Sequence, residues 1–543
     1  MPEVHGSLPV RSATSGRLAS SDAPSILPSA YPDPRVHVPR LLRLVARGLR
    51  EGPSDFVRVR GLFLSGLGLA YLCAFASIWP QVHGLIGSGG IAPVGDTLDS
   101  VEAHCGGVDP LRFPTLLWID CGDGALHLLC GGGVLLSLLV VAGIARLPCL
   151  ALLWAAYLSL FTAGLWFTSF QWDTLLLESG FLALFLAPLR LTPGGARGVE
   201  VSRLALWAQR YLLFRLMFAS GVVKLTAGDG AWLDLTALSY HYETQPLPAW
   251  TSWHLHRLPL WFHEATAGFT CSVELLAPLL IFLGRVPRLV AFLSIAGLQV
   301  AILLTGNYGF FNLLTLAISL TLLDDAMLPW RGAAAAPAVA PWPPVRWARR
   351  AALAALLLLA TAEFLPALDW APAWPRPLQE AWRRSGLEAL ASRTDRLRLS
   401  SSYGLFRVMT RERREILVEG SSDGQRWEPY VFKHKPGPLD RAPGFVGPHM
   451  PRLDWQMWFA ALSDFERTPW FAPFLRRLLE NEPAVLALLE ENPFPEAPPR
   501  FVQATLYRYG FTSPEERRAT GAWWKRTEVG PYSPRLFRRP RAP

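Results

Sequence analysis

Long apolar runs constrain this chain more than any other feature of its sequence. A helix needs about 20 apolar residues to cross the hydrocarbon core of a bilayer. Nine stretches approach or reach this length: Gly61–Trp79, Gly124–Ile144, Leu147–Ser169, Trp172–Leu189, Leu204–Thr226, Ala265–Leu283, Leu289–Thr305, Asn307–Leu323 and Ala351–Leu368. Hydrophobic residues make up 51% of the chain, and its mean hydropathy is +0.23. We therefore predict a polytopic α-helical membrane protein with about 8–9 spans.

The distribution of arginine predicts how these spans are oriented. Arginines gather before the first span and in every second connection after it, whereas the connection 80–123 is acidic. Cytoplasmic connections carry the excess of positive charge, so the N-terminus is predicted to be cytoplasmic. An odd number of spans then puts the C-terminal region on the opposite side. These arginines also explain the net charge of +9. No basic stripe interleaved with stacking aromatics indicates nucleic-acid binding.

Three regions follow from this pattern. Residues 1–57 are rich in Pro, Ser and Arg and are predicted to form a disordered basic cytoplasmic tail. Residues 58–370 form the multi-span helical membrane domain. Residues 371–543 are predicted to be a soluble α+β domain on the outer face, periplasmic or lumenal.

Strand and helix patterns mix within this C-terminal region. Strands are predicted at 397–410, 415–419, 427–433, 501–509 and 523–526, with a hairpin turn at 422–424. Helices are predicted at 454–464, 471–480 and 483–491. The first of these helices carries tryptophans that would either bind a client or be buried as core.

Charged side chains inside the predicted spans are costly to place in lipid. They include Asp173, Glu178, Arg215, Lys224 and Glu274. Opposite charges on separate spans predict an intramembrane polar network. Such a network would either fix helix packing only, or hold a proton relay or catalytic base. One alternative for Lys224 is that its ammonium group reaches the membrane interface.

The connection Ser239–His263 holds four histidines, three tryptophans and two tyrosines. Its core segment, HYETQP, comprises His241, Tyr242, Glu243, Thr244, Gln245 and Pro246. The prolines favour extended backbone before them. His241 and Glu243 would then project to one side of the segment, and the two residues between and after them to the other. We predict that this loop either binds a client or docks against the C-terminal domain.

The motifs that would indicate a metal, a cofactor or a known enzyme class are not evident. No HExxH or similar ligand spacing accompanies the four histidines, so neither a metal nor a cofactor is predicted. A nucleophile elbow and a phosphate-binding loop are not evident either. Cys105 and Cys121 share one polar connection and would form a disulfide if it faces an oxidising compartment.

Four sequence blocks resemble the lipase maturation factor family. They are FTSFQWDTLLLESGFLALFLAP (Phe167–Pro188); the segments Arg210–Leu225 and Trp232–His263, the second of which contains HYETQPLP; the segments Val273–Arg285 and Leu303–Asp325, the first of which is VELLAPLLIFLGR; and C-terminal segments that include SSYGLFRVMTRERREILVEGS and RLDWQMWFAAL (Arg452–Leu462). The resemblance covers about residues 55–535. It implies a chaperone-like membrane protein that helps secreted lipases reach their folded, active form in the endoplasmic reticulum. The composition favours a bacterial member, which would work in the inner membrane.

The resulting hypothesis is a membrane-embedded maturation factor whose partners are the lipid bilayer and a secreted client, a lipase by resemblance. The alternative is a membrane enzyme that acts on a lipid or a protein side chain. It would require a polar cavity joining Glu178, Lys224, Glu274 and His241, and separate pairing of these groups would contradict it. A transporter would need internal repeats, and none is evident.

Overall fold

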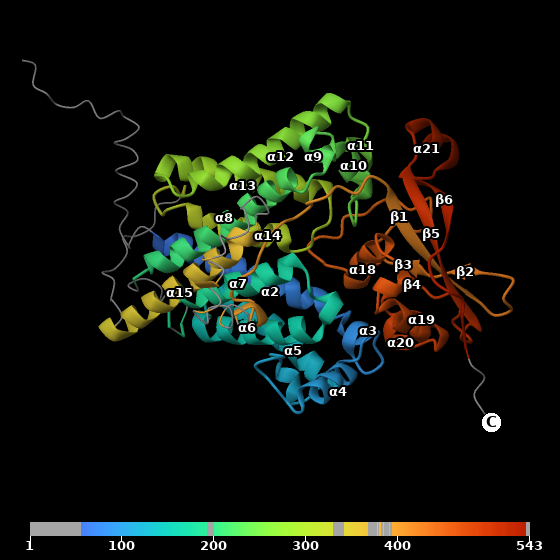
Figure 1. Ribbon diagram of the computed structural model, residues 1–543, viewed down its shortest axis with the longest axis horizontal. Coiled ribbons are helices and arrows are strands. Elements are labelled where there is room, and N and C mark those ends of the chain that lie inside the picture. Colours follow the sequence, from blue (N-terminus) through green and yellow to red (C-terminus); the bar gives the residue numbers. More distant parts are fainter. Residues whose placement is uncertain are drawn as a thin grey trace, which may run out of the picture. The chain divides into compact units, whose positions relative to one another are not determined.

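The structure is a computed structural model that describes residues 56–189, 191–192, 200–329, 342–367, 377, 380, 381, 384, 390 and 394–538. The predicted tail 1–57 lies outside the described residues except for its last two positions. Most of the predicted start of the C-terminal domain, 371–393, also lies outside them. Figure 1 shows the long helices in blue to yellow and the β-rich C-terminal region in orange and red.

Every predicted span contains a helix. The long helices are α2 (Val57–Ile78), α5 (Asp123–Ala142), α6 (Arg146–Ala163), α7 (Gln171–Leu184), α8 (Arg203–Thr226), α12 (Leu260–Leu280), α13 (Arg285–Thr305), α14 (Phe311–Ser319) with a 3-10 turn η4 (Leu320–Leu322), and α15 (Pro343–Ala367). Four of them, α2, α5, α6 and α13, are long and apolar enough to cross a membrane by length and composition. By contrast, α7 has 14 residues and is about 21 Å long, which is short of a bilayer core of about 30 Å. The count of 8–9 spans stays a prediction.

Short helices and turns connect the long ones. They are α3 (Val82–Ile86), α4 (Val94–Cys105), η2 (Leu116–Trp118), η3 (Leu165–Phe167), α9 (Gly230–Leu233), α10 (Ala237–Thr244) and α11 (Trp250–Leu255). The last two, α10 and α11, fold much of the predicted aromatic connection Ser239–His263 into helical turns rather than an open loop.

Glycines in α5 allow it to pack closely against α2. A Cβ atom on Gly133 would clash with the ring of Phe75, and one on Gly131 would lie 3.0 Å from the ring of Trp79. A Cβ atom on Gly132, which lies between these two, would meet open space. The close packing expected of small residues in membrane helices is therefore present at two of the three consecutive glycines.

Replacing Gly133 with leucine should destabilise the helical domain by about 1–3 kcal/mol, because the added side chain must displace Phe75 from a close-packed position. The matched control is Gly132→Leu on the same helix, which meets no atom within 4 Å. The melting temperature of the detergent-solubilised protein, followed by tryptophan fluorescence, measures the difference. Equal melting temperatures for the two variants would contradict the packing argument.

The C-terminal region is an α+β fold, as predicted. Its strands are β1 (Arg413–Ser421), β2 (Glu428–Pro429), β3 (Val431–Phe432), β4 (Leu489–Glu491), β5 (Phe501–Phe511), β6 (Trp524–Pro531) and β7 (Leu536–Phe537). Its helices are α18 (Arg452–Ala461), η5 (Phe465–Arg467), α19 (Phe471–Leu479), α20 (Pro483–Leu486) and α21 (Pro514–Thr520). Antiparallel strands form the main sheet in the order β2-β1-β5-β6, with β7 pairing to β5, while β3 and β4 pair separately.

Two predictions for this region were wrong. Residues 397–410 do not form a strand, because this segment runs along the membrane helices and its polar groups bond to them instead of to a neighbouring strand. The predicted helix 483–491 ends at Leu486, and its last three residues form β4, which pairs with β3. The predicted turn at 422–424 is correct: it joins β1 to β2, and Gly424 has a φ of 80°.

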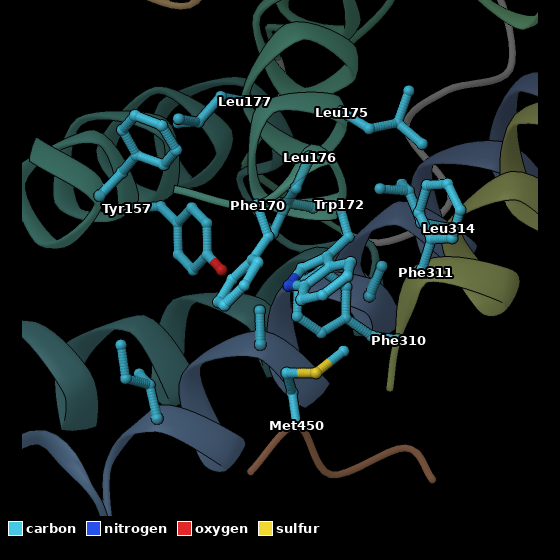
Figure 2. Packing of buried hydrophobic residues seen from close by; sticks show 14 of the residues in the cluster. Tyr157, Phe170, Trp172, Leu175, Leu176, Leu177, Phe310, Phe311, Leu314 and Met450 are labelled. Carbon is cyan, nitrogen blue, oxygen red and sulfur yellow. The ribbon is translucent and has the colours of Figure 1, made fainter. Parts of the chain in front are cut away.

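The helices and the C-terminal domain share one hydrophobic core rather than two. A single cluster of buried side chains runs from α2, α6 and α7 through α14 into α18, α19 and β5. Figure 2 shows Met450, two residues before the start of α18, packed among Trp172, Phe310 and Phe311 of the membrane domain. The domain that the sequence predicted to rest on the membrane face is therefore packed into the ends of the helices.

Candidate functional site

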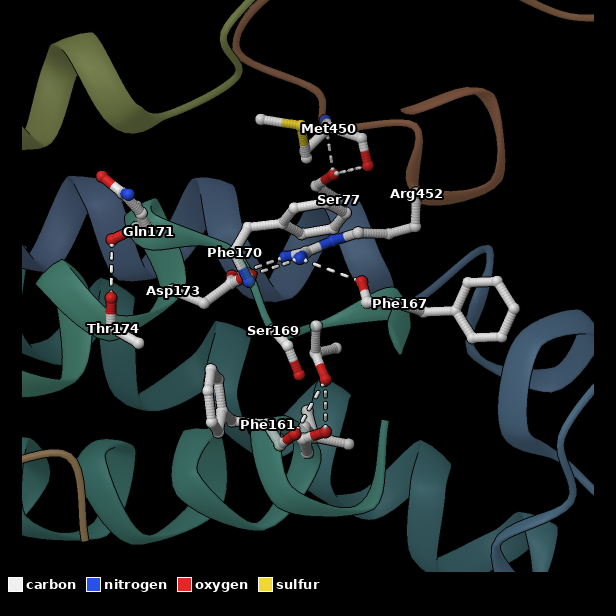
Figure 3. A network of polar contacts seen from close by, with 12 residues as sticks. Ser77, Phe161, Phe167, Ser169, Phe170, Gln171, Asp173, Thr174, Met450 and Arg452 are labelled. Atoms are coloured by element: carbon white, nitrogen blue, oxygen red, sulfur yellow. Dashed lines mark hydrogen bonds and ion pairs between the residues drawn. The ribbon is translucent and has the colours of Figure 1, made fainter. Parts of the chain in front are cut away.

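The charges predicted to form one intramembrane network form three separate ion pairs in the structure. The first joins Asp173, in the first turn of α7, to Arg452, the first residue of α18. Two guanidinium nitrogens donate to the two carboxylate oxygens at 2.6 and 2.8 Å, which is the strong bidentate geometry. Tyr157 donates to the same carboxylate. Arg452 also donates to the carbonyl of Phe167 at 3.2 Å, and Figure 3 shows Arg452 between Asp173 and this carbonyl. Both charged side chains are completely buried.

The second pair joins Glu178 of α7 to Arg215 of α8. The segment 394–412 completes it from the C-terminal side of the chain. The hydroxyl of Tyr403 donates to Glu178 at 2.7 Å, and Arg215 donates to the carbonyl of Ser401 at 2.9 Å. Each charged group is thus satisfied partly by its helix partner and partly by the C-terminal chain.

The third pair joins Lys224 near the end of α8 to Glu274 of α12 at 2.7 Å. Lys224 is buried by this contact, so the predicted alternative, in which it reaches the interface, was wrong. Its ammonium group also donates to the carbonyl of Leu405 at 3.0 Å and lies 5.1 Å from the centre of the Trp232 ring. All three pairs therefore contact residues beyond position 400. Only the Asp173–Arg452 pair itself links a helix to the C-terminal domain, whereas the other two join helices to each other and are hydrogen-bonded to the segment 401–405.

Sequence reasoning missed Arg452 and Tyr403 as partners of these charges. Both lie in the part predicted to be soluble, where an arginine or a tyrosine is ordinarily exposed. The available signal was their position within blocks that resemble the family, RLDWQMWFAAL and SSYGLF. Periodicity alone could not pair them with spans more than 200 residues away.

The HYETQP segment is not extended, contrary to the prediction. Its first four residues form the second half of α10, which ends at Thr244. Only Gln245 adopts the extended backbone that Pro246 imposes, with φ −58° and ψ 154°. The proline effect acts on the one residue before each proline, so it ends the helix here without unwinding it.

Arg413 of β1 holds the end of this helix. One guanidinium nitrogen donates to the carbonyls of Glu243 and Gln245 at 2.9 and 2.6 Å, and the other donates to the carbonyl of Pro246 at 3.0 Å. A helix leaves its last carbonyls without partners, and a buried cation satisfies them well. Arg413 is also paired with Glu415 at 2.6 Å.

Further contacts bind the HYETQP segment to the C-terminal domain. The carboxylate of Glu243 accepts from the backbone N–H of Phe511 at the end of β5, at 2.7 Å. The indole of Trp458 in α18 donates to the carbonyl of Thr244 at 2.9 Å. Of the two roles predicted for this loop, the contacts in the structure correspond to docking against the C-terminal domain. Most polar groups of this loop are therefore already hydrogen-bonded and are not available to a client.

A buried polar cluster lies behind this contact. Tyr308 donates to Gln245 at 2.9 Å, and its oxygen lies 3.1 Å from Nε2 of His241. Because the single hydroxyl proton of Tyr308 goes to Gln245, Nε2 of a neutral His241 carries the proton that it donates to Tyr308. Burial, followed by the nearby charge of Lys224, lowers the pKa of His241 from 6.5 to about 4.

This pKa predicts a loss of stability in acid. The folded-state value lies below the value of 6.5 for an ordinary histidine, so the stabilising contribution is complete above about pH 6.5 and is lost as the pH falls toward 4. The melting temperature should decline over this interval, and His241→Gln should decline less. His104→Gln, an exposed position on α4, is the control and should follow the unaltered protein. Parallel curves for all three proteins would contradict the assignment.

The other histidines of the connection do not gather around one point. Nε2 of His256 lies 3.6 Å from the carboxylate of Glu243, whereas His254 and His263 pack against aromatic rings. Within the part of the chain that the structure describes, no group of three or more His, Cys, Asp or Glu side chains is placed to hold a metal ion. In this structure the histidines serve packing and hydrogen bonding.

Cys105 and Cys121 are both free in the structure. Cys105 is the last residue of α4, whereas the sulfur of Cys121 lies 3.9 Å from a Cβ built on Gly95 at the start of that helix. Ten residues of helix separate these positions by about 15 Å. The two thiols are not bonded in this structure, and the disulfide stays a prediction.

The cavity that the enzyme hypothesis required is only partly present. Lys224, Glu274 and His241 line one cavity of about 540 Å³ between α8, α10, α12 and α13. Glu178 does not line it and is paired instead with Arg215. Because Lys224 and Glu274 also neutralise each other, no unpaired carboxylate of this set is available as a catalytic base.

A larger cavity of about 860 Å³, the junction cavity, lies where α7, α8, α13 and α14 meet the segment 404–414 and α18. Aromatic rings form much of its wall. Trp172 stands 4.7 Å from Trp455 and 6.5 Å from Phe311, measured between ring centres. Trp455 is buried, whereas Phe459 on the same helix is 39% exposed. The helix is therefore partly buried as core and partly exposed, so neither of the two predicted alternatives describes all of it.

Both parts of the chain match models of known protein domains. Residues 58–330 match the model of the lipase maturation factor transmembrane domain, and residues 399–534 match that of the lipase maturation factor C-terminal domain. The chain is 37% identical to lipase maturation factor 2 of Homo sapiens, over 88% of this chain and 82% of that protein. It is 36% identical to lipase maturation factor 1 of Bos taurus, over 91% of this chain and 92% of that protein. No solved structure matches the chain.

Proposed function

Because the chain belongs to the lipase maturation factor family, we propose that it is a membrane-embedded factor that helps a secreted lipase reach its folded, active form. The relatives named as maturation factors align with both the helices and the C-terminal domain. One observation in the structure supports the proposal: the two parts are joined by the buried Asp173–Arg452 pair, by hydrogen bonds between residues 401–405 and two further buried pairs, and by one continuous core. Such a joint keeps the C-terminal domain at the membrane, where a newly exported client emerges.

The arginines at the helix ends support a cytoplasmic N-terminus. Arg146 at the start of α6 donates to Ser65 in the first half of α2 at 2.6 Å. Arg285 at the start of α13 pairs with Asp324 at 2.6 Å, beyond the end of α14. Ends rich in arginine therefore lie at the same end of the helices, which is the side that the positive-inside rule assigns to the cytoplasm.

The C-terminal domain attaches to the opposite helix ends. Ser77 at the end of α2 accepts from the backbone N–H of Met450 at 2.7 Å, and Gln81 accepts from the backbone N–H of Arg452 at 2.8 Å. In this orientation the domain faces the periplasm in a bacterium, or the lumen of the endoplasmic reticulum in a eukaryote. A factor for secreted clients would need its working surface there.

The proposal is tested by deleting the gene in its native host and measuring each secreted lipase. We expect lower lipase activity per unit of lipase transcript, restored by the unaltered gene. Arg413→Met, which loosens the loop that holds the two parts together, should restore less activity than an equally abundant Arg508→Met control. Unchanged activity of every secreted lipase after deletion would refute a lipase client.

A further inference from the structure

The helices α8 and α15, green and yellow in Figure 1, flank a cavity of about 520 Å³ at the ends where both of them begin. They run side by side in the same direction. The hydroxyl groups of Tyr211 and Thr361 are hydrogen-bonded at 2.8 Å. One turn further along both helices, the rings of Phe214 and Phe364 are 5.9 Å apart between their centres. The volume of the cavity lies within the range of about 300–1,000 Å³ typical of pockets that hold small molecules.

Four arginines line this cavity, which we call the arginine cavity. Arg203 comes from α8, whereas Arg346, Arg349 and Arg350 come from α15. Among the described residues of the lining, Glu200 supplies the one carboxylate. The adjoining stretches of sequence, 190–199 and 330–341, contain further arginines and no acidic residue. The positive charge of the cavity is therefore offset only in part.

Three of these guanidinium groups have donors to spare. Arg349 is engaged, because it donates to the carbonyl of the residue that follows α7. Arg350 lies 5.5 Å from the centre of the Trp347 ring, a contact that offers its N–H groups no oxygen acceptor. In the part of the chain that the structure describes, the side chains of Arg203 and Arg346 have neither a hydrogen bond nor an ion pair. A ligand with several oxygen atoms would supply the missing acceptors.

The placement of these arginines is unfavourable without an anion. The N-terminal end of a helix carries partial positive charge, so cations are stabilising at the opposite end. Yet Arg203 is the first residue of α8, and Arg346 lies in the first turn of α15. Arg346 and Arg350 are also four residues apart on one helix, a spacing at which like charges repel. The orientation of the helices in a membrane depends on the number of arginines at this end and not on their convergence at one cavity.

We propose that the arginine cavity binds the phosphate group of an anionic ligand, held by Arg203, Arg346 and Arg350 at the positive ends of α8 and α15. Guanidinium groups bind phosphate oxygens through paired hydrogen bonds, and helix N-termini favour the same anion. A tetrahedral phosphate directs oxygens toward three arginines on two helices, whereas a planar carboxylate has only two oxygens to share. The head group of an anionic lipid and a soluble phosphate both supply this chemistry. The inference does not rest on the identity of any client.

The test uses the full-length protein in nanodiscs and has two arms. In the lipid arm, phosphatidylcholine nanodiscs contain a small fraction of phosphatidic acid, and native mass spectrometry measures the lipids that the released protein retains. In the soluble arm, nanodiscs of phosphatidylcholine alone are titrated with inorganic phosphate in a calorimeter. Retention of phosphatidic acid at least fivefold above its share of the lipids would identify a lipid head group as the source. Saturable binding of one phosphate per protein would identify a soluble anion.

One pair of variants tests the charge of the site. Arg203→Gln combined with Arg350→Gln should lower binding at least fivefold in the arm that responds, because two of the three proposed ligands are lost. Arg467→Gln combined with Arg518→Gln is the control, since it removes two exposed arginines of the C-terminal domain that do not line the cavity. The control should bind as the unaltered protein does.

A second pair tests the cavity itself and leaves the charge unchanged. Ala354→Trp places a large ring in the lining and should also lower binding at least fivefold. Ala355→Trp is the control, because the neighbouring residue is equally exposed and does not line the cavity.

Three outcomes would overturn the proposal. The first is the absence of binding in both arms. The second is binding that the loss of Arg203 and Arg350 leaves unchanged. The third is binding that these arginines control but that Ala354→Trp leaves unchanged, which would mean a diffuse attraction of anions to the end of the helices that is rich in arginine.

Discussion

Replacing Arg452 with methionine is expected to destabilise the protein by about 3–5 kcal/mol, because the change leaves the fully buried carboxylate of Asp173 without its cation. Methionine has a similar length but cannot donate the two hydrogen bonds at 2.6 and 2.8 Å. The carbonyl of Phe167 loses a donor as well. We expect a large fall in melting temperature and rapid proteolysis at the junction of α18 with the helices.

The double variant Arg452→Met with Asp173→Asn distinguishes a lost charge partner from lost packing. Asparagine keeps the shape of the side chain without its charge, so the double variant should recover a large part of the lost stability. Arg467→Met is the matched control, since its guanidinium is 81% exposed and its pair with Asp464 spans 3.9 Å. It should change stability by less than about 0.5 kcal/mol. A single variant as stable as the control would show that the pair contributes nothing.

Replacing Arg413 with methionine should have the second-largest effect. Three buried carbonyls at the end of α10 would lose their donor, and each such loss costs about 1–3 kcal/mol before relaxation. Glu415 would keep its pair with Lys435 at 2.9 Å, so no carboxylate is left alone. We expect a net loss of about 3–4 kcal/mol, since the carbonyls can regain part of the loss by shifting toward water.

Hydrogen exchange gives this variant a local signature. Backbone amides of residues 237–249 should exchange faster in Arg413→Met, while those in α5 should remain protected. Arg508→Met is the control, because this residue is also an arginine of the main sheet but its side chain is 61% exposed. Faster exchange throughout the helices would mean that Arg413 supports the whole fold rather than this contact.

The helices could be predicted from sequence because each depends on a continuous local signal. Every predicted span coincides with a helix, and the strand pattern near Glu415 and near Val502 marks β1 and β5 correctly. Residues 397–410 have the same strand pattern and yet form none. Their partners are the helices, and local alternation does not reveal which surface a segment contacts.

The candidate site was predictable only in part, for the same reason. The sequence predicts pairing among Glu178, Arg215, Lys224 and Glu274, because ions in a membrane need partners, and the structure has two pairs among them. Arg452 and Arg413 were missed, since each lies far along the chain from the groups that it binds. Contacts of that separation are a property of the assembled fold, and one sequence contains no periodicity that reports them.

The Asp173–Arg452 pair has a consequence for how the protein is made. Asp173 is synthesised 279 residues before its partner. Its carboxylate gains this cation only once the C-terminal domain has folded against the helices. A chain that stops before residue 452 would leave a buried carboxylate without its cation. The pair therefore makes the packing of α7 depend on a residue near the other end of the chain.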